Sequence, residues 1–84
     1  AFSRSLALDV APAVRVNCVC PADVDTPLMR KQCDKGGYKI EDCANVYPLG
    51  RIAKPEEIAH VICAVASPAN GFMTGAVIPV TGGL

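Results

Sequence analysis

The sequence has no net charge and no long apolar run. Its 84 residues carry eight basic and eight acidic side chains, so the formal charge at pH 7 is zero. A balanced charge gives no electrostatic reason to expect a nucleic acid or an anionic membrane surface as a partner. The longest apolar run is interrupted by His60, and it is much shorter than the roughly 20 residues of a membrane-spanning helix. We therefore expect neither a nucleic-acid nor a membrane partner.

The chain also begins without an initiator methionine. Residues 1–4 already follow a helical pattern, and no basic segment followed by an apolar core marks them as a secretory signal peptide. We interpret this start as a cut edge. The length allows one small domain at most, which we place at residues 1–84, and the hydrophobic content of 51% is typical of a globular protein.

The cysteines do not form the even, regularly spaced set of a disulfide framework. There are five, at positions 18, 20, 33, 43 and 63. Reduced thiols in a cytoplasmic protein are the better interpretation. Cys18 and Cys20 share one face of a strand, but the other three cysteines supply no second close pair, so we expect no metal site. Buried small hydrophobic side chains are the alternative that we favour.

The most informative stretch is residues 14–20, which the sequence predicts as a strand. Valines at 14, 16 and 19 suit a pleat, and both faces are mostly apolar from Val16 onward, as in a parallel sheet covered on both sides. Pro21 is expected to end the strand, because it has no N–H for the ladder. Loops that follow the carboxyl ends of such strands bind ligands in open α/β sheets. Residues 21–27 are therefore the first candidate site.

The other elements are predicted from periodicity and from residues that begin or end helices. Apolar spacing predicts a helix over residues 1–11 and another from Pro55, where Ile58, Val61, Ile62 and Val65 follow the i, i+3, i+4, i+7 pattern. Thr26-Pro27 is typical of a helix start. Residues 28–47 have a weak pattern, which we interpret as short mobile helices around a Gly36-Gly37 hinge. Residues 48–51 are expected to form a turn, and residues 76–80 an edge strand.

Strand, helix and strand make one βαβ unit, so the fold class is α/β with parallel strands. Two strands and two helices cannot bury the faces that they present, because sheets of fewer than three strands are marginal. A core of this size rarely stabilises a fold by more than about 3–5 kcal/mol. We therefore expect the chain to be one end of a larger α/β domain.

Several short motifs occur in a recognisable order. They are Ser3-Arg4-Ser5-Leu6-Ala7, Arg15-Val16-Asn17-Cys18-Val19-Cys20-Pro21, Val24-Asp25-Thr26-Pro27-Leu28, Pro48-Leu49-Gly50-Arg51, Pro55-Glu56-Glu57-Ile58-Ala59, Phe72-Met73-Thr74-Gly75 and Val80-Thr81-Gly82-Gly83. Together they resemble the C-terminal third of the classical short-chain dehydrogenase/reductase family. The resemblance implies the C-terminal βαβ portion of a Rossmann-type doubly wound parallel sheet. It also implies an oxidoreductase that uses NAD or NADP on a small alcohol or carbonyl substrate, as a homodimer or homotetramer.

The resemblance places no catalytic residue in this chain. The family has a glycine-rich phosphate turn and a Ser/Tyr/Lys set with a Y-x-x-x-K segment. The chain has no G-x-G-x-x-G, and its two tyrosines, Tyr38 and Tyr47, are followed four residues later by Asp42 and Arg51. The alternative function is a truncated, inactive chain that serves as a binding or interaction module. A small metal or redox module built on the cysteines is a third hypothesis.

The resemblance assigns cofactor binding to Pro21, Ala22, Val24 and Thr26. In the family, backbone groups at the position of Val24 contact the nicotinamide, and a hydroxyl at the position of Thr26 bonds the carboxamide or the pyrophosphate. A helix N-terminus with free N–H groups attracts phosphate oxygens in any case. The alternative for Thr26 is a plain helix N-cap, worth about 1 kcal/mol, and both roles can coexist.

Two positions depart from the family pattern, and several others have two interpretations. Ala22 replaces a usual Gly, which raises the possibility of a shifted or strained turn, and Thr81 replaces a common Asp. We expect the two aspartates of the loop, Asp23 and Asp25, to shape it through Asx-turns. His60 is interpreted as a surface or interface histidine. The tyrosines at 38 and 47 either line a substrate pocket or pack the segment before residue 48.

Overall fold

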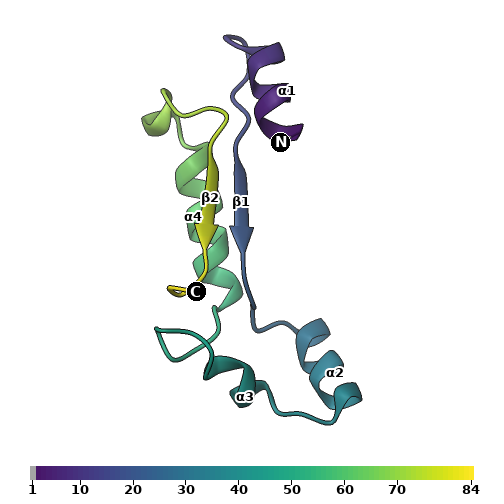
Figure 1. Cartoon of the computed structure of the whole chain (residues 1–84). Helices are drawn as coiled ribbons and strands as arrows, with labels where there is room; N and C mark the ends of the chain where they lie inside the picture. Colours follow the sequence, from purple (N-terminus) through teal and green to yellow (C-terminus); the bar gives the residue numbers. More distant parts are fainter. Residues whose placement is uncertain (1) are drawn as a thin grey trace.

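The computed structural model describes residues 2–84, and it contains four α-helices, a short 3₁₀ helix and two strands within them (Figure 1). In chain order these are α1 (Phe2–Val10), β1 (Cys18–Pro21), α2 (Pro27–Gly36), α3 (Ile40–Ala44), α4 (Pro55–Ala66), η1 (Pro68–Asn70) and β2 (Val77–Val80). The predicted helices at the start of the chain and after Lys54 are confirmed, with residue 1 lying outside the described residues. The predicted turn over residues 48–51 is also present.

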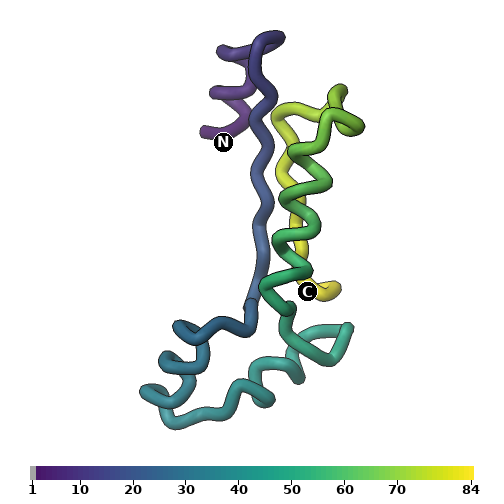
Figure 2. The backbone as a smooth tube through the Cα atoms, turned by 180° about the vertical axis from the view of Figure 1, so that it is seen from behind, coloured from purple at the N-terminus to yellow at the C-terminus, as the bar shows by residue number. Residues whose placement is uncertain are grey.

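The two strands form a parallel pair, and α4 runs alongside them as the connection (Figures 1 and 2). The register pairs Cys18 with Val77 and Pro21 with Val80. This confirms the predicted βαβ unit and the α/β fold class. Both strands run toward the end of the molecule that carries α2 and α3, so the two carboxyl ends lie beside the segment that follows β1 (Figure 1).

The strand bounds differ from the prediction. We expected strands over residues 14–20 and 76–80, but the ladder begins at Cys18 and Val77 and includes Pro21. The residues before Cys18 lie outside the ladder. The N–H of Val14 donates back to the carbonyl of Val10. Val16 donates to Thr74 Oγ1 and accepts the N–H of Gly75, two residues that precede β2. Pro21 fits because the N–H groups that point to β2 come from the even positions, such as Cys18 to the carbonyl of Ala76.

Packing within the described residues is sparse. The buried hydrophobic residues are Ala7, Cys33 and Tyr47, whereas Phe2 is 82% exposed and Phe72 is fully exposed. The radius of gyration is 15.7 Å and the extents are 48 × 22 × 20 Å. A compact chain of this length would have a radius of gyration of about 12 Å. The chain is therefore elongated. Phe2, Leu6 and Leu8 of α1 are exposed, whereas Ile58, Val61 and Val65 of α4 are half-buried and Ile62 is exposed.

The weakly patterned segment 28–47 consists of α2, a short connection and α3. Thr26 caps α2 and Pro27 occupies its first turn, as predicted. Gly37 ends α2 with a left-handed φ of 75°, a conformation that favours glycine, and its N–H donates to the carbonyls of Asp34 and Cys33. The Gly36-Gly37 pair is thus a helix terminus, and its role as a hinge stays a prediction. Among the helices of residues 2–84, none has the length and apolarity needed to cross a membrane.

Candidate functional site

The candidate site is the loop of residues 21–27, which leaves the carboxyl end of β1 and leads into α2 (Figure 1). We call residues 21–26 the cofactor loop. Its first part continues the ladder, because the N–H of Ala22 donates to the carbonyl of Val80 at 3.3 Å. The sequence reasoning placed the ligand loop at this strand end, and the structure brings Pro21, Ala22, Val24 and Thr26 together in it.

A parallel bridge between Val24 and Ala53 fixes the middle of the loop. The N–H of Ala53 donates to the carbonyl of Asp23 at 3.1 Å, and the N–H of Asp25 donates to the carbonyl of Ala53 at 2.8 Å. In a trans peptide the C=O and the following N–H point in opposite directions. Both backbone polar groups of Val24 therefore point away from Ala53. Within residues 2–84 neither group has a hydrogen-bond partner, so both can bind a ligand.

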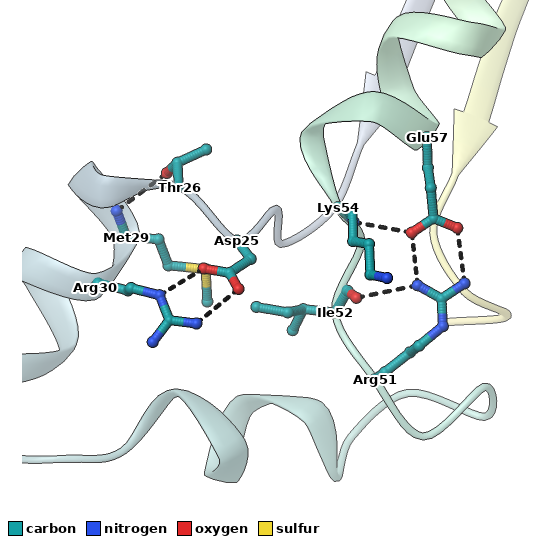
Figure 3. Close-up of polar contacts among 8 residues, drawn as sticks. All are labelled: Asp25, Thr26, Met29, Arg30, Arg51, Ile52, Lys54 and Glu57. Atoms are coloured by element: carbon teal, nitrogen blue, oxygen red, sulfur yellow. Dashed lines mark hydrogen bonds and ion pairs between the residues drawn. The ribbon is translucent and has the colours of Figure 1, made fainter.

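Thr26 closes the loop as the N-cap of α2. Its φ of −124° and ψ of 159° are extended, and its hydroxyl oxygen accepts the N–H of Met29 at 3.1 Å (Figure 3). The predicted N-cap is confirmed. A hydroxyl has one proton and two lone pairs, so a capping threonine can still donate its proton to another group. The cap and a ligand contact are compatible at this residue.

An ion pair ties the loop to the first turns of α2. The guanidinium of Arg30 donates to both carboxylate oxygens of Asp25, from Nε at 2.8 Å and from Nη2 at 2.7 Å (Figure 3). These hydrogen bonds lower the pKa of Asp25. The expected Asx-turn at Asp25 is wrong, because a longer-range cation holds the carboxylate. Such two-point pairing fixes direction as well as distance.

The neighbouring carboxylate, Asp23, pairs with Tyr47, a residue 24 positions further along the chain. The phenol of Tyr47 donates to Asp23 Oδ2 at 2.7 Å, and the backbone N–H of Asp23 donates to the phenol oxygen at 3.1 Å. The hydrogen bond to the carboxylate raises the pKa of Tyr47. This reciprocal contact, rather than the expected Asx-turn, shapes the loop at Asp23. Tyr47 is 7% exposed, whereas Tyr38 is half exposed.

A small cavity of about 80 Å³ lies beside this contact. Of the loop, only Ala22 and Asp23 line it; the rest of the lining is Tyr47, Leu49, Arg51, Ile52, Ala53, Glu57, Val80, Thr81 and Gly82. At its rim Arg51 donates to both carboxylate oxygens of Glu57, at 2.6 and 2.7 Å (Figure 3). Glu57 also accepts the N–H of Lys54 at 2.9 Å. The hydrogen bonds from Arg51, which have the largest effect, and the bond from Lys54 lower the pKa of Glu57 to about 2. The pair holds the segment that carries Ala53.

The two departures from the family pattern are accommodated locally. Every described residue with positive φ is a glycine, so Ala22 fits the turn without a left-handed conformation. The expectation of strain at Ala22 is therefore wrong. Thr81 donates from its hydroxyl to the carbonyl of Leu84 at 3.5 Å, a long bond within the last residues.

The remaining candidates contribute little to the site. All five cysteines are free, and the sulfurs of Cys18 and Cys20 lie 3.6 Å apart on one face of β1, as their spacing predicts. The interpretation as buried side chains holds for Cys33 and is wrong for Cys20 and Cys63, which are exposed. Within residues 2–84 no three His, Cys, Asp or Glu side chains are grouped as a metal site would require. His60 is exposed on α4, in agreement with a surface position.

Comparison with known proteins identifies the family. A family model described as enoyl-(acyl carrier protein) reductase matches residues 1–84. A short-chain dehydrogenase of Aspergillus ruber is 43% identical over 84 residues, with 98% of this chain and 30% of the relative covered. The chain belongs to the short-chain dehydrogenase/reductase family.

Other relatives of this short-chain dehydrogenase/reductase chain agree. A 3-oxoacyl-(acyl-carrier-protein) reductase of Thermotoga maritima is 42% identical over 71 residues, with 84% of this chain and 28% of the relative covered. The ligand-free structure of an aldohexose dehydrogenase from Thermoplasma acidophilum superimposes with a TM-score of 0.92 at 38% identity, covering 99% of this chain and 36% of that one. The chain spans about 30% of the length of the curated relatives it matches. Its fold is the C-terminal portion of their Rossmann-type sheet, as expected.

The sequence reasoning located the loop but missed the side chains that hold it. The pairs Arg30–Asp25 and Arg51–Glu57 lie five and six positions apart in the sequence. Opposite charges at these short separations were the available signal. The contact between Tyr47 and Asp23 had no such signal, because it depends on how the chain returns after α3.

Proposed function

We propose that this chain supplies the nicotinamide side of an NAD or NADP site in an oxidoreductase that acts on a small alcohol or carbonyl substrate. The observation that carries the proposal is the orientation of the Val24 backbone. Its N–H and C=O both point out of the Val24–Ala53 bridge, at the carboxyl end of two parallel strands. A nicotinamide carboxamide has one acceptor and one donor group, which such a backbone pair can satisfy.

Thr26 and the start of α2 add the second half of the recognition. The hydroxyl proton of Thr26 is suited to the carboxamide oxygen or to a pyrophosphate oxygen. The first turn of α2 contains no acidic residue, so the positive end of its dipole is not neutralised and favours an anion. Pro21 and Ala22 carry the chain from the sheet into this position. When bound, the cofactor would supply or accept the hydride.

In this proposal the chain binds and orients the cofactor but provides no proton-transfer group. It has no Y-x-x-x-K segment, so residues 1–84 alone are expected to be inactive. Residues 28–47 would form a lid over the substrate. The open edge of β2 and the exposed side of α4, where Val77 and Ile62 are 53% and 50% exposed, would pair two copies in a homodimer or homotetramer.

The test is a pair of substitutions at Thr26 in the polypeptide that the gene encodes. Thr26→Ala removes the hydroxyl and should weaken NADH or NADPH binding by about 1–3 kcal/mol, the value of a hydrogen bond to a charged or strongly polar group. Thr26→Ser keeps the hydroxyl and should bind nearly as the parent does. Isothermal titration calorimetry measures both.

Thr74→Ala is the matched control. It also removes a threonine hydroxyl that accepts a backbone N–H, that of Val16, but this residue precedes β2 at the opposite end of the sheet. If Thr26→Ala and Thr74→Ala bind the cofactor equally well, Thr26 is only a cap. A parent protein that binds neither NADH nor NADPH contradicts the proposed function and favours the alternative of a binding or interaction module without chemistry.

A further inference from the structure

The contact between Tyr47 and Asp23 holds the cofactor loop at Asp23, which lies between the proposed cofactor positions Ala22 and Val24. Two hydrogen bonds make this contact, at 2.7 Å through the carboxylate and at 3.1 Å through the backbone N–H. The carbonyl of Asp23 is held separately by the N–H of Ala53. Asp23 is therefore fixed at its side chain and at both of its backbone polar groups.

These restraints determine where Val24 points. The carbonyl of Asp23 and the N–H of Val24 belong to the same peptide unit, so fixing one fixes the direction of the other. The bond from Asp23 N–H to the phenol holds the preceding peptide unit, which leaves little freedom for rotation at Asp23. Without the phenol, only the backbone bridge to Ala53 would orient Val24.

Tyr47 is itself held firmly, as an anchor needs to be. Its ring packs against Gly82, where an added Cβ would lie 3.4 Å from the ring atom Cδ1. The carbonyl of Tyr47 accepts the N–H of Gly50 at 2.8 Å, and the N–H of Leu49 donates to the carbonyl of Gly82 at 3.1 Å. Tyr47 is thus held against Gly82, just after the end of β2. A phenol with its ordinary pKa of about 10 is protonated near neutral pH, and the hydrogen bond to the carboxylate of Asp23 raises the pKa of Tyr47 further, so the phenol remains a donor.

We infer that Tyr47 is a positioning residue for the cofactor loop, acting through Asp23 to direct the backbone groups of Val24 toward the nicotinamide. The inference rests on the proposed function, and it adds a consequence to it. Tyr47, which orients the loop, is the last residue of segment 28–47, so the geometry of the nicotinamide side depends on the end of the proposed lid.

The test compares Tyr47→Phe with Tyr38→Phe in the polypeptide that the gene encodes. Tyr47→Phe keeps the ring and removes both hydrogen bonds, and it should weaken NADH or NADPH binding about tenfold, as expected for one bond to a charged group. Tyr38→Phe makes the same chemical change at a half-exposed ring and should leave binding unchanged. Hydrogen exchange at the amides of Asp25 and Ala53 should also become about tenfold faster in Tyr47→Phe, because these amides form the bridge.

A second set of variants approaches the contact from the other side. Asp23→Asn keeps an acceptor for the phenol and should lose clearly less affinity than Tyr47→Phe. Asp23→Ala removes the bond to the carboxylate but keeps the backbone N–H that donates to the phenol, so its loss should lie between those of Asp23→Asn and Tyr47→Phe. The double variant Asp23→Ala/Tyr47→Phe should bind no worse than Tyr47→Phe alone, since Tyr47→Phe already removes the bond to the carboxylate.

The outcomes separate this inference from the proposed function. A purely structural role predicts a lower unfolding midpoint for Tyr47→Phe with unchanged cofactor affinity and unchanged exchange at the bridge, and that result overturns the inference. Additive losses in the double variant overturn it as well. If the parent binds no cofactor, the proposed function fails, and the exchange rates of Asp25 and Ala53 still decide whether Tyr47 positions the loop.

Discussion

Replacing Arg15 should destabilise the end of α4 more than any other single surface change in this chain. Arg15 lies between α1 and β1, and its guanidinium donates to the carbonyls of Val65, Ala66 and Ser67 at 3.1, 3.1 and 3.3 Å. It also donates to the carbonyl of Met73 at 3.1 Å. The last carbonyls of a helix have no partner within the helix, and a cation near them interacts favourably with the dipole.

The magnitude follows from the number and exposure of these bonds. Arg15→Met keeps a long apolar side chain and removes four hydrogen bonds. Each carbonyl is partly accessible to water, so each bond contributes less than the 1.5–3 kcal/mol of a buried bond to a charge, and the sum is about 2–4 kcal/mol. Arg15→Lys keeps the charge, but a single ammonium cannot span four carbonyls, so it should lose about half as much.

The assay is urea unfolding of the polypeptide that the gene encodes, combined with hydrogen exchange at the last turn of α4. Exchange measures the opening of that turn directly, so it applies even where global unfolding is not cooperative. Arg4→Met is the matched control, because within residues 2–84 the Arg4 side chain forms no hydrogen bond and no ion pair. If the free energies of unfolding of Arg15→Met and Arg4→Met differ by less than about 0.5 kcal/mol, water replaces the guanidinium at no cost, and the reasoning is refuted.

Two further predictions concern pH and the isolated chain. The pKa of Glu57 is lowered from 4.5 to about 2 by Arg51 and the Lys54 N–H, so its contribution to stability is complete above pH 4.5 and is lost as the pH falls through about 2. The difference in free energy of unfolding between the parent and Glu57→Gln, measured with urea, should therefore shrink over this window, and a constant difference would contradict the prediction. Residues 1–84 alone should show no cooperative thermal transition by circular dichroism and no NAD(P)H turnover, because Ala7, Cys33 and Tyr47 are the buried hydrophobic residues of the described chain; a sharp transition or measurable turnover would contradict this.

The helices could be predicted because their signals are local. Thr26-Pro27 and Lys54-Pro55 mark helix starts through the chemistry of the first turn. The Gly36-Gly37 pair, interpreted from the sequence as a hinge, ends α2, with Gly37 at a left-handed φ. The strand bounds were less predictable, because a run of β-branched residues indicates only that these side chains suit a pleated strand. Where pairing begins depends on the partner strand, and in the described chain that partner starts only at Val77.

The cofactor loop shows the same limit more sharply. Its place after β1 follows from fold topology, so the sequence sufficed to find it. The direction of Val24, however, is set by Ala53 and by Tyr47, residues 29 and 23 positions further along the chain, through bonds made only after the chain has folded back. No periodicity encodes such contacts.

This arrangement has a physical consequence for binding. Three contacts join the cofactor loop to other parts of the chain. Tyr47 joins it to the end of segment 28–47, and the ion pair of Asp25 with Arg30 joins it to the start of α2. The bridge to Ala53 joins it to the segment before α4. A ligand that fixes Val24 would therefore stabilise all three joints together, and any change that loosens one joint would lower the affinity that the others support. The sparse packing of the chain makes this coupling depend on a few hydrogen bonds, rather than on a buried core, so substitutions at single polar side chains should affect it measurably.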